Sequence, residues 1–203
     1  MPQDDSDYYE QHATSFFRDT VAVEMAPLHG PFLKHLPANG HILDAGCGSG
    51  RDARAVLELG YRVTAFDSAP TLAALATEHL GQSVQVLRFE ELSWHDKFDG
   101  IWACASLLHV PRRELPNVFQ RLANALKPGG VLYCSFKYGT GEREAGGRRF
   151  TDLDEAGLRQ LLPETGGLTL IEMWQTGDQR PDRRDERWLN ALLRKPEAPC
   201  LPI

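Results

Sequence analysis

The feature that most constrains this chain is a glycine-rich loop between a short apolar run and a helical segment. It reads Leu43-Asp44-Ala45-Gly46-Cys47-Gly48-Ser49-Gly50. Glycine is needed where the backbone turns sharply or must approach a ligand without a Cβ in the way. The helix that follows presents unpaired N–H groups at its first turn. A strand, this loop and a helix predict an α/β fold with a ligand at the loop, although a tight structural turn would use the same glycines.

Apolar runs and helical segments alternate along the rest of the chain. The predicted strands are 41–45, 61–66, 84–89, 99–105, 131–136, 168–175 and 188–193. The predicted helices are 8–23, 25–36, 52–59, 69–80, 113–126 and 152–162, the last capped by Thr151, with a turn at 127–130 and a glycine-rich loop at 138–149. Such alternation gives a mostly parallel sheet covered by helices on both faces. Because no helix separates the last two strands, they could pair as a hairpin with one strand antiparallel.

Length and composition predict a single globular domain. The chain has 203 residues, 42% of them apolar and 25% charged, which suffices for a full core. We expect an N-terminal helical cap or lid over 1–37, a core over 38–195 and a frayed tail over 196–203. No run of eighteen apolar residues occurs and the chain starts with polar, acidic residues, so a cytoplasmic protein without membrane spans is expected.

Cysteine spacing and net charge argue against two kinds of site. The four cysteines are widely and irregularly spaced and form no Cys-x-x-Cys, so neither a metal site nor a redox pair is predicted. The formal net charge is −6, which argues against nucleic acid as a partner. A small-molecule ligand is therefore favoured, and the oligomeric state is not indicated.

The glycine spacing and a later acid indicate which ligand the loop holds. The third glycine of G-x-G-x-G comes one residue earlier than in the dinucleotide fingerprint G-x-G-x-x-G. This favours a nucleoside with an uncharged linker, such as S-adenosylmethionine, over NAD. Asp67 ends the second predicted strand and can accept hydrogen bonds from both ribose hydroxyls. Alternatively it caps the next helix, although Ser68 is better placed for that.

Four segments together resemble the class I S-adenosylmethionine-dependent methyltransferases. They are LDAGCGSG, the acid after the second strand, FDGIWACASLLHVP and LANALKPGGVLYCSF. The resemblance extends from His41 to about Lys195. It implies a Rossmann-like three-layer sandwich with a seven-stranded, mostly parallel sheet whose last strand is antiparallel. The short length, ACASLLHVP and the SFKYG segment resemble the tellurite-resistance-type and related small-molecule methyltransferases.

The resemblance also implies contacts to S-adenosylmethionine. The loop would lie under the methionine part, with Asp44 holding the loop or the amine through water and Arg51 reaching the carboxylate. Asp67 would hold the ribose, and Ser68 would lie beside the adenine. The residues expected to bind the cofactor are Tyr9, Asp44, Gly46, Cys47, Gly48, Gly50, Arg51, Asp67, Ser68, Phe89, Glu90, Ala103 and Ser106.

The acceptor site is expected after the fourth and fifth strands. Alignment of the nucleophile alone can supply about 7–11 kcal/mol, and a base is needed only for a protonated nucleophile. His109 is the expected catalytic base, with packing under the Val110-Pro111 turn as the alternative. Tyr9 is the expected lid, because an aromatic ring attracts a sulfonium. The residues expected to bind an anionic acceptor are Lys137, Tyr138, Arg148 and Arg149, whereas the charged segment 180–187 is expected to be a solvated connection.

These features predict an enzyme, a S-adenosylmethionine-dependent methyltransferase that acts on a small molecule by direct displacement. An oxyanion such as tellurite or selenite, or a small metabolite, is the expected acceptor. Two alternatives remain. One is an RNA or protein methyltransferase, which would need a broad basic face. The other is a non-catalytic regulatory protein that binds S-adenosylmethionine.

Overall fold

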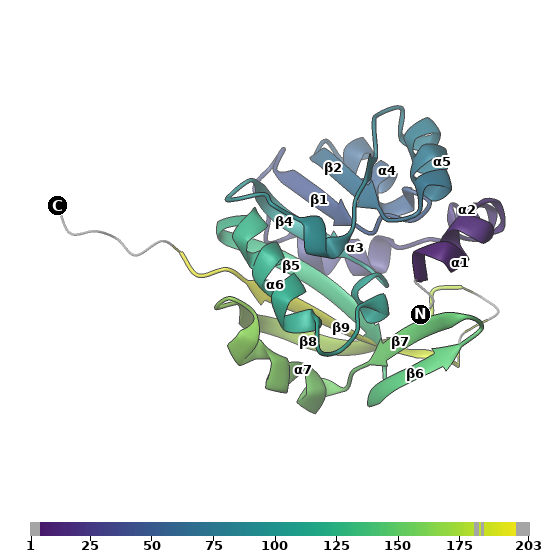
Figure 1. Cartoon of the computed structure of the whole chain (residues 1–203). Helices are drawn as coiled ribbons and strands as arrows, with labels where there is room; N and C mark the ends of the chain where they lie inside the picture. Colours follow the sequence, from purple (N-terminus) through teal and green to yellow (C-terminus); the bar gives the residue numbers. More distant parts are fainter. Residues whose placement is uncertain (1–4, 181–182, 184, 198–203) are drawn as a thin grey trace.

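A seven-stranded sheet forms the centre of the computed structural model, which describes residues 5–180, 183 and 185–197 (Figure 1). The strand order is β3-β2-β1-β4-β5-β9-β8. Only β9 runs antiparallel to its neighbours β5 and β8, so the α/β class and the antiparallel last strand are confirmed. The strands are β1 His41–Ala45, β2 Arg62–Asp67, β3 Gln85–Val86, β4 Phe98–Ala103, β5 Leu126–Lys137, β8 Thr169–Gly177 and β9 Arg187–Arg194.

Helices cover both faces of the sheet because successive side chains of its central strands are buried on opposite sides. On one face Leu43, Ile101 and Leu132 pack against α6 and α7. On the other face Ile42 and Trp102 pack against α3 and α4, and α5 packs beside α4. This arrangement is the three-layer sandwich that the sequence implied (Figure 1). The helices are α3 Ala26–Leu33, α4 Arg51–Glu58, α5 Pro70–Leu80, α6 Leu115–Ala125 and α7 Glu155–Leu161.

The N-terminal segment forms two short helices, α1 Asp5–Gln11 and α2 Ala13–Thr20, where the sequence predicted one over 8–23. The break falls at His12, the N-cap of α2, whose backbone is not helical. Its ring Nδ1 donates to the carbonyl of Tyr8 at 2.8 Å. Both helices contact α5, and α1 also contacts β7 (Figure 1). The segment therefore lies beside the sheet rather than on it.

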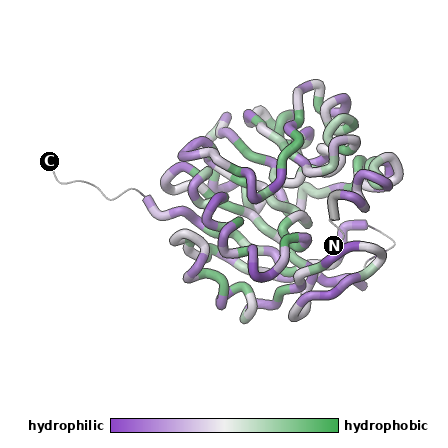
Figure 2. The backbone as a smooth tube through the Cα atoms, viewed as in Figure 1, coloured by the Kyte–Doolittle hydropathy of each residue, from purple (hydrophilic) through white to green (hydrophobic). Residues whose placement is uncertain are grey.

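Segment 138–149 is not the loop that the sequence predicted. It contributes to an antiparallel hairpin of β6 Gly141–Ala145 and β7 Arg148–Asp152. Gly146 and Gly147 form its two-residue turn with φ of +57° and +73°, the backbone that matches the twist of two-residue hairpins. Every residue of β6 is exposed, and the hairpin is mostly hydrophilic (Figure 2). The missed signal was a Gly-Gly pair between Glu144 and Arg149, residues of opposite charge that lie opposite each other in the hairpin.

Three smaller predictions also need correction. The expected turn at 127–130 is the first part of β5, with a register shift against β4. The third strand is only Gln85–Val86, and a 3₁₀ turn at Phe89–Glu91 replaces its end. The last helix is capped by Asp154, which accepts a hydrogen bond from the Gly157 N–H, because Thr151 belongs to β7.

The tail expected at 196–203 lies largely outside the described residues, which end at 197. Within the described part of the chain, every helix is too short or too polar to cross a membrane.

Candidate active site

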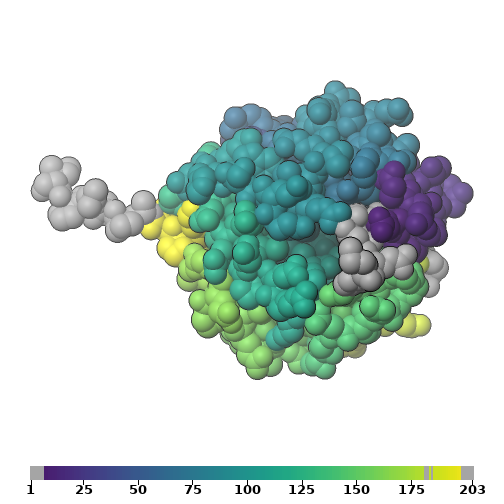
Figure 3. All heavy atoms as spheres, in the orientation of Figure 1, coloured from purple at the N-terminus to yellow at the C-terminus, as the bar shows by residue number. Residues whose placement is uncertain are grey.

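A cavity of about 520 Å³ opens at the carboxyl ends of the parallel strands. Chain order reverses here, since β1 is followed by β2 and β3 on one side and by β4 and β5 on the other. Crevices outside the strand ends at such a switch point are the usual ligand sites of α/β sheets. The volume lies within the range typical of small-molecule sites. Helix α1 contacts β7 of the hairpin, and the N-terminal helices and the hairpin lie on the same side of the molecule (Figure 3).

The glycine loop forms one wall of this cavity. Gly46, Cys47 and Gly48 line it. Gly46 has φ of +74°, and a Cβ there would meet Cβ of Ser106 at 2.6 Å, so only glycine fits. At Gly48, with φ of +56°, a Cβ would press on the ring of Phe16 at 3.1 Å. The loop therefore offers bare backbone to a ligand.

Gly50, expected to bind the cofactor, is not among the described residues that line the cavity. It has φ of +74° and begins α4 as its N-cap. A Cβ there would meet Ala76 and Leu80 of α5 at 3.3 Å. The glycine is required by helix packing and backbone conformation rather than by a ligand.

Asp67 lies at the end of β2, on the cavity wall and only 8% exposed. One carboxylate oxygen accepts the Gly48 N–H at 2.9 Å and the other accepts the Ala69 N–H at 3.0 Å. Burial raises the pKa of Asp67 above its usual value, although these N–H groups favour the charged form. The carboxylate thus ties the glycine loop to the start of α5 while facing the cavity.

Ser68 lines the cavity but does not cap the following helix, contrary to expectation. The N-cap of α5 is Ala69, whose methyl side chain accepts no hydrogen bond from the first turn of the helix. Asp67 satisfies the Ala69 N–H instead. The capping and ligand roles that seemed to compete for Asp67 are therefore compatible, because each carboxylate oxygen has more than one acceptor position.

Asp44 holds the first turn of the helix after the loop. Its carboxylate accepts the Ala53 N–H at 3.0 Å, and it lines the cavity. Burial, followed by the charge of Asp52, raises the pKa of Asp44 well above its usual value. Its position agrees with loop-holding, the first of the two roles considered for it.

Asp52 is a cavity residue that sequence reasoning missed. Arg51 donates to both of its oxygens, at 3.1 and 2.8 Å, and the cavity also borders Arg51. His29 and Trp102 donate to the same carboxylate, each at 3.0 Å. Burial acts against its charge, but Arg51 and these hydrogen bonds hold the pKa of Asp52 below its usual value. An acid in a helix's first turn was its sequence signal.

The expected adenine contacts lie after β3, and the amine contacts after β4. Phe89 and Glu90 line the cavity, with the Phe89 ring edge-to-face against Phe66 at 5.3 Å. Ser106 also lines it and donates to the Ala45 carbonyl at 2.6 Å. Ala103 is fully buried within β4 and is not among the described lining residues.

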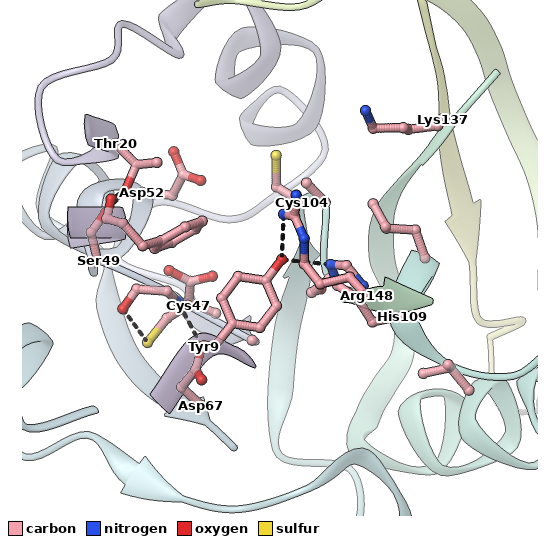
Figure 4. A pocket seen from close by; sticks show the side chains of 18 of the residues that line it. Tyr9, Thr20, Cys47, Ser49, Asp52, Asp67, Cys104, His109, Lys137 and Arg148 are labelled. Carbon is pink, nitrogen blue, oxygen red and sulfur yellow. Dashed lines mark hydrogen bonds between the residues drawn. The ribbon is translucent and has the colours of Figure 1, made fainter. Parts of the chain in front are cut away.

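Tyr9 and His109 meet across the cavity (Figure 4). His109 Nδ1 lies 2.8 Å from the Arg149 carbonyl, which can only accept, so Nδ1 carries the proton in the neutral ring. Nε2 then bears a lone pair and accepts the Tyr9 hydroxyl at 2.7 Å. The expected lid residue and the expected base are thus joined by one short hydrogen bond.

Three of the four expected acceptor-binding residues line the same cavity: Lys137, Arg148 and Arg149. Lys137 forms an ion pair with Glu186, and Arg148 NH1 lies 3.5 Å from the Tyr9 hydroxyl. Tyr138 does not join them, because it is 38% exposed and its hydroxyl bonds Glu155 outside the cavity.

The segment after β8 lines the cavity as well, so the expectation of a purely solvated connection is wrong. Asp178 and Arg180 form a bidentate ion pair, with N–O distances of 2.9 and 2.6 Å. The Asp178 side chain is only 5% exposed and also accepts the Trp188 indole N–H. Residues 181, 182 and 184 of this segment lie outside the described residues.

Known proteins resemble this chain in sequence. Residues 42–130 match a family described as a methyltransferase domain. The ubiquinone biosynthesis O-methyltransferase of Xanthomonas campestris pv. campestris is 39% identical over 101 residues, which are 46% of this chain and 41% of that protein. The cypemycin N-terminal methyltransferase of a Streptomyces species is 28% identical over 184 residues, 86% of this chain and 71% of that protein. The chain thus spans about two fifths of the curated O-methyltransferase.

A solved structure resembles the whole chain. It is the Burkholderia thailandensis 1,6-didemethyltoxoflavin-N1-methyltransferase, with bound 1,6-didemethyltoxoflavin and S-adenosylhomocysteine. The TM-score is 0.76 at 25% identity, covering 97% of this chain and 91% of that one. The likeness extends over both the sheet and the N-terminal helices.

Proposed function

We propose that this protein binds S-adenosylmethionine and methylates a small molecule. The match of residues 42–130 to a methyltransferase domain and the likeness to a solved methyltransferase structure support this. One observation carries the proposal. The bare backbone of the glycine loop and the Asp67 carboxylate face one cavity at the sheet's switch point.

The nucleoside fits the chemistry of this wall. Asp67 has no cationic partner among its hydrogen bonds, which come from backbone N–H groups. Its remaining acceptor positions suit the two neutral hydroxyls of a ribose, and they would not suit a pyrophosphate. Phe89 beyond Asp67 offers an apolar surface to the adenine. Gly46 and Gly48 border the cavity without side chains of their own, so a ligand chain can lie against the loop backbone.

The methionine part of S-adenosylmethionine would lie toward α4. Arg51 lines the cavity, and its pairing with Asp52 fixes the guanidinium. A carboxylate can share that guanidinium, which has donors besides the two that Asp52 accepts. Tyr9 and Phe16 border the space between this end and the acceptor side, where their rings can attract a positive sulfonium.

The sulfonium supplies an activated methyl group, so the protein has to align the acceptor, exclude water and remove a proton where one is present. His109 is suited to the last task, because its Nδ1–H is held by the Arg149 carbonyl and Nε2 is the basic atom. Tyr9 lies between this nitrogen and the cofactor wall.

A small acceptor agrees with the size of the cavity, about 520 Å³ for cofactor and acceptor together. The Burkholderia neighbour was solved with bound 1,6-didemethyltoxoflavin and S-adenosylhomocysteine, which supports a small-molecule acceptor here. Tellurite and selenite stay a prediction from the sequence resemblance, and they belong in an acceptor screen beside aromatic hydroxyl compounds.

Thermal unfolding with S-adenosylhomocysteine, with NAD as the control, tests cofactor binding. A ligand at ~100 times its dissociation constant adds about 2.7 kcal/mol to the free energy of unfolding. For a domain of this size the midpoint should rise by roughly 5–10 °C. We expect this shift with the nucleoside and none with NAD; equal shifts, or none, would refute the proposal. Methyl transfer from labelled cofactor to an acceptor mixture then separates an enzyme from a regulatory protein.

A further inference from the structure

Arg148 is a partly buried cation that lines the cavity on its acceptor side. Its guanidinium carbon lies 4.6 Å from the ring centre of Tyr8, 5.2 Å from that of Phe150 and 5.9 Å from that of Tyr9. Its Nε is buried and has no hydrogen-bond partner. Its one hydrogen bond within the described chain, from NH1 to the Tyr9 hydroxyl, is long at 3.5 Å.

Three other cations of the same cavity differ from Arg148 because each is paired with a carboxylate. Arg51 is paired with Asp52, Lys137 with Glu186, and Arg180 with Asp178. Arg148 has no such ion pair within residues 5–180, 183 and 185–197. Because the Arg148 Nε–H is withdrawn from water and lacks an acceptor, a bound anion that accepts from it would stabilise this side chain.

A proton acceptor lies directly beside this cation. The Tyr9 hydroxyl, which Arg148 contacts, donates to Nε2 of His109 (Figure 4). A hydroxyl bound next to Tyr9 can donate to the tyrosine oxygen while the tyrosine proton moves to His109. Cation and base together are suited to turning a bound hydroxyl into an oxyanion.

We propose that the acceptor carries an acidic hydroxyl, a phenol or an enol, whose oxygen binds Arg148 Nε and whose proton reaches His109 through Tyr9. The O–H electron pair stays on the acceptor oxygen. That pair forms the new bond to the methyl carbon as the carbon–sulfur bond breaks and its pair stays on sulfur. Amine acceptors are disfavoured, because an ammonium would meet the Arg148 charge. The inference rests on the proposed function and specifies its substrate class.

The ionisation of 4-nitrophenol, read from its own visible absorbance, tests the inference. The probe is titrated in the presence of saturating S-adenosylhomocysteine, with 4-nitrobenzylamine as the cationic counterpart. We expect 4-nitrophenol to bind, its bound pKa to fall below the free value, and the amine to bind at least about tenfold more weakly.

Variants assign the effect to this guanidinium. Arg148→Met should weaken 4-nitrophenolate about tenfold or more and abolish the pKa shift, and Arg148→Lys should restore part of both. Arg143→Met is the matched control. It removes a cation of the same hairpin that pairs with Asp152 and does not line the cavity, so binding of the probe should be unchanged.

The outcomes separate this inference from the proposed function. If S-adenosylhomocysteine binds but 4-nitrophenol does not, or the amine binds equally well, the acceptor class is wrong and the cofactor proposal stands. A pKa shift that survives in Arg148→Met also overturns the inference. If the wild-type protein does not bind S-adenosylhomocysteine at all, the proposed function itself is refuted.

Discussion

Asp67 shows how one side chain can serve the fold and a ligand together. Its carboxylate accepts the N–H of Gly48 and that of Ala69, so it fixes the glycine loop against α5. The same carboxylate borders the cavity. Under the proposed function, replacing it therefore removes a ligand contact and also loosens the loop that forms the neighbouring wall.

Substitution of Asp67 should weaken cofactor binding, and Asp67→Ala should weaken it at least as much as Asp67→Asn. Asp67→Asn keeps one carbonyl oxygen but turns an N–H₂ group toward a backbone N–H, and we expect its affinity for S-adenosylhomocysteine to fall about 10- to 100-fold. Asp67→Ala should lose at least as much. Titration calorimetry measures both, with Asp96→Asn as the control, since Asp96 precedes the amino end of β4 and does not line the cavity. Unchanged affinity in Asp67→Asn would remove this carboxylate from the site.

Cofactor affinity should also depend on pH through this group. Burial raises the pKa of Asp67, so it takes up a proton at a higher pH than an ordinary aspartate at about 3.9. Affinity for S-adenosylhomocysteine should fall as the pH falls through that raised pKa. Because the raised pKa means that the folded protein holds this proton more tightly than the unfolded chain, the free energy of unfolding of the unliganded protein should fall as the pH rises from about 3.9 through the pKa of Asp67. A pH-independent affinity in wild type, or the same dependence in Asp67→Asn, would contradict this.

Asp52 should matter for stability more than any exposed acid of its helix. Asp52→Ala would leave the Arg51 guanidinium, the His29 ring and the Trp102 indole N–H without their shared acceptor. We expect the free energy of unfolding to fall by about 3–5 kcal/mol in urea titrations. Arg54→Ala breaks an exposed pair in the same helix and should change it by about 0.5 kcal/mol or less. Similar values for the two variants would contradict the account.

At the scale of elements, α1 bridges two parts of the molecule that are far apart in sequence. At one side Glu10 accepts the Thr71 N–H at 2.9 Å, at the start of α5. At the other side Tyr9 bonds His109, and the Tyr8 ring packs on Arg148 of β7. The helix thus connects the cofactor wall to the acceptor wall, and its docking should affect ligand exchange.

Weakening the exposed end of this bridge should speed ligand release. Glu10→Gln removes the negative charge at the α5 N-terminus but keeps an amide oxygen. We expect S-adenosylhomocysteine to dissociate about two- to fivefold faster in stopped-flow displacement. Glu58→Gln, which breaks an exposed pair away from the cavity, is the control. Equal dissociation rates in all three proteins would show that α1 does not limit release.

Elements with strong local signals were predicted well, and those that depend on contacts were not. The glycine loop, its flanking strand and helix, and the β8–β9 pair follow from local pattern. The hairpin β6–β7 did not, because β6 is wholly exposed and has no apolar alternation to mark it. The break at His12 depends on side-chain geometry that a helical composition does not reveal.

At the scale of the whole molecule, the sheet centre and the cavity rim should differ in stability. β1, β4 and β5 are buried on both faces, whereas every residue of β6 is exposed and the described side chains of α1 are partly buried or exposed. Hydrogen exchange by mass spectrometry should show fast exchange in α1 and the hairpin and near-global protection in the central strands. S-adenosylhomocysteine should slow exchange mainly at the glycine loop and α1. Uniform protection before and after binding would contradict this.

The cavity as a whole was predictable only in part, because its residues come from distant segments. The loop, Asp67 and His109 stand at strand ends, where sequence order indicates the position. Asp52 and segment 176–180 could not be placed, because long-range packing against Trp102 and Trp188 brings them to the cavity. Gly50 belongs to the glycine pattern, but a side chain is excluded there by the contact of α4 with α5 and not by the cavity.

The hairpin begins and ends at one point of the sheet. The Leu153 N–H bonds the Lys137 carbonyl at 3.1 Å, and the Gly139 N–H bonds the Leu153 carbonyl at 3.4 Å. Residues 138–152 therefore form a closed excursion from β5, anchored to the core by Phe150 and Thr151. The excursion carries Arg148 and Arg149, so under the proposed function we expect exchange of its other residues to change acceptor preference while the glycine loop and Asp67 are kept.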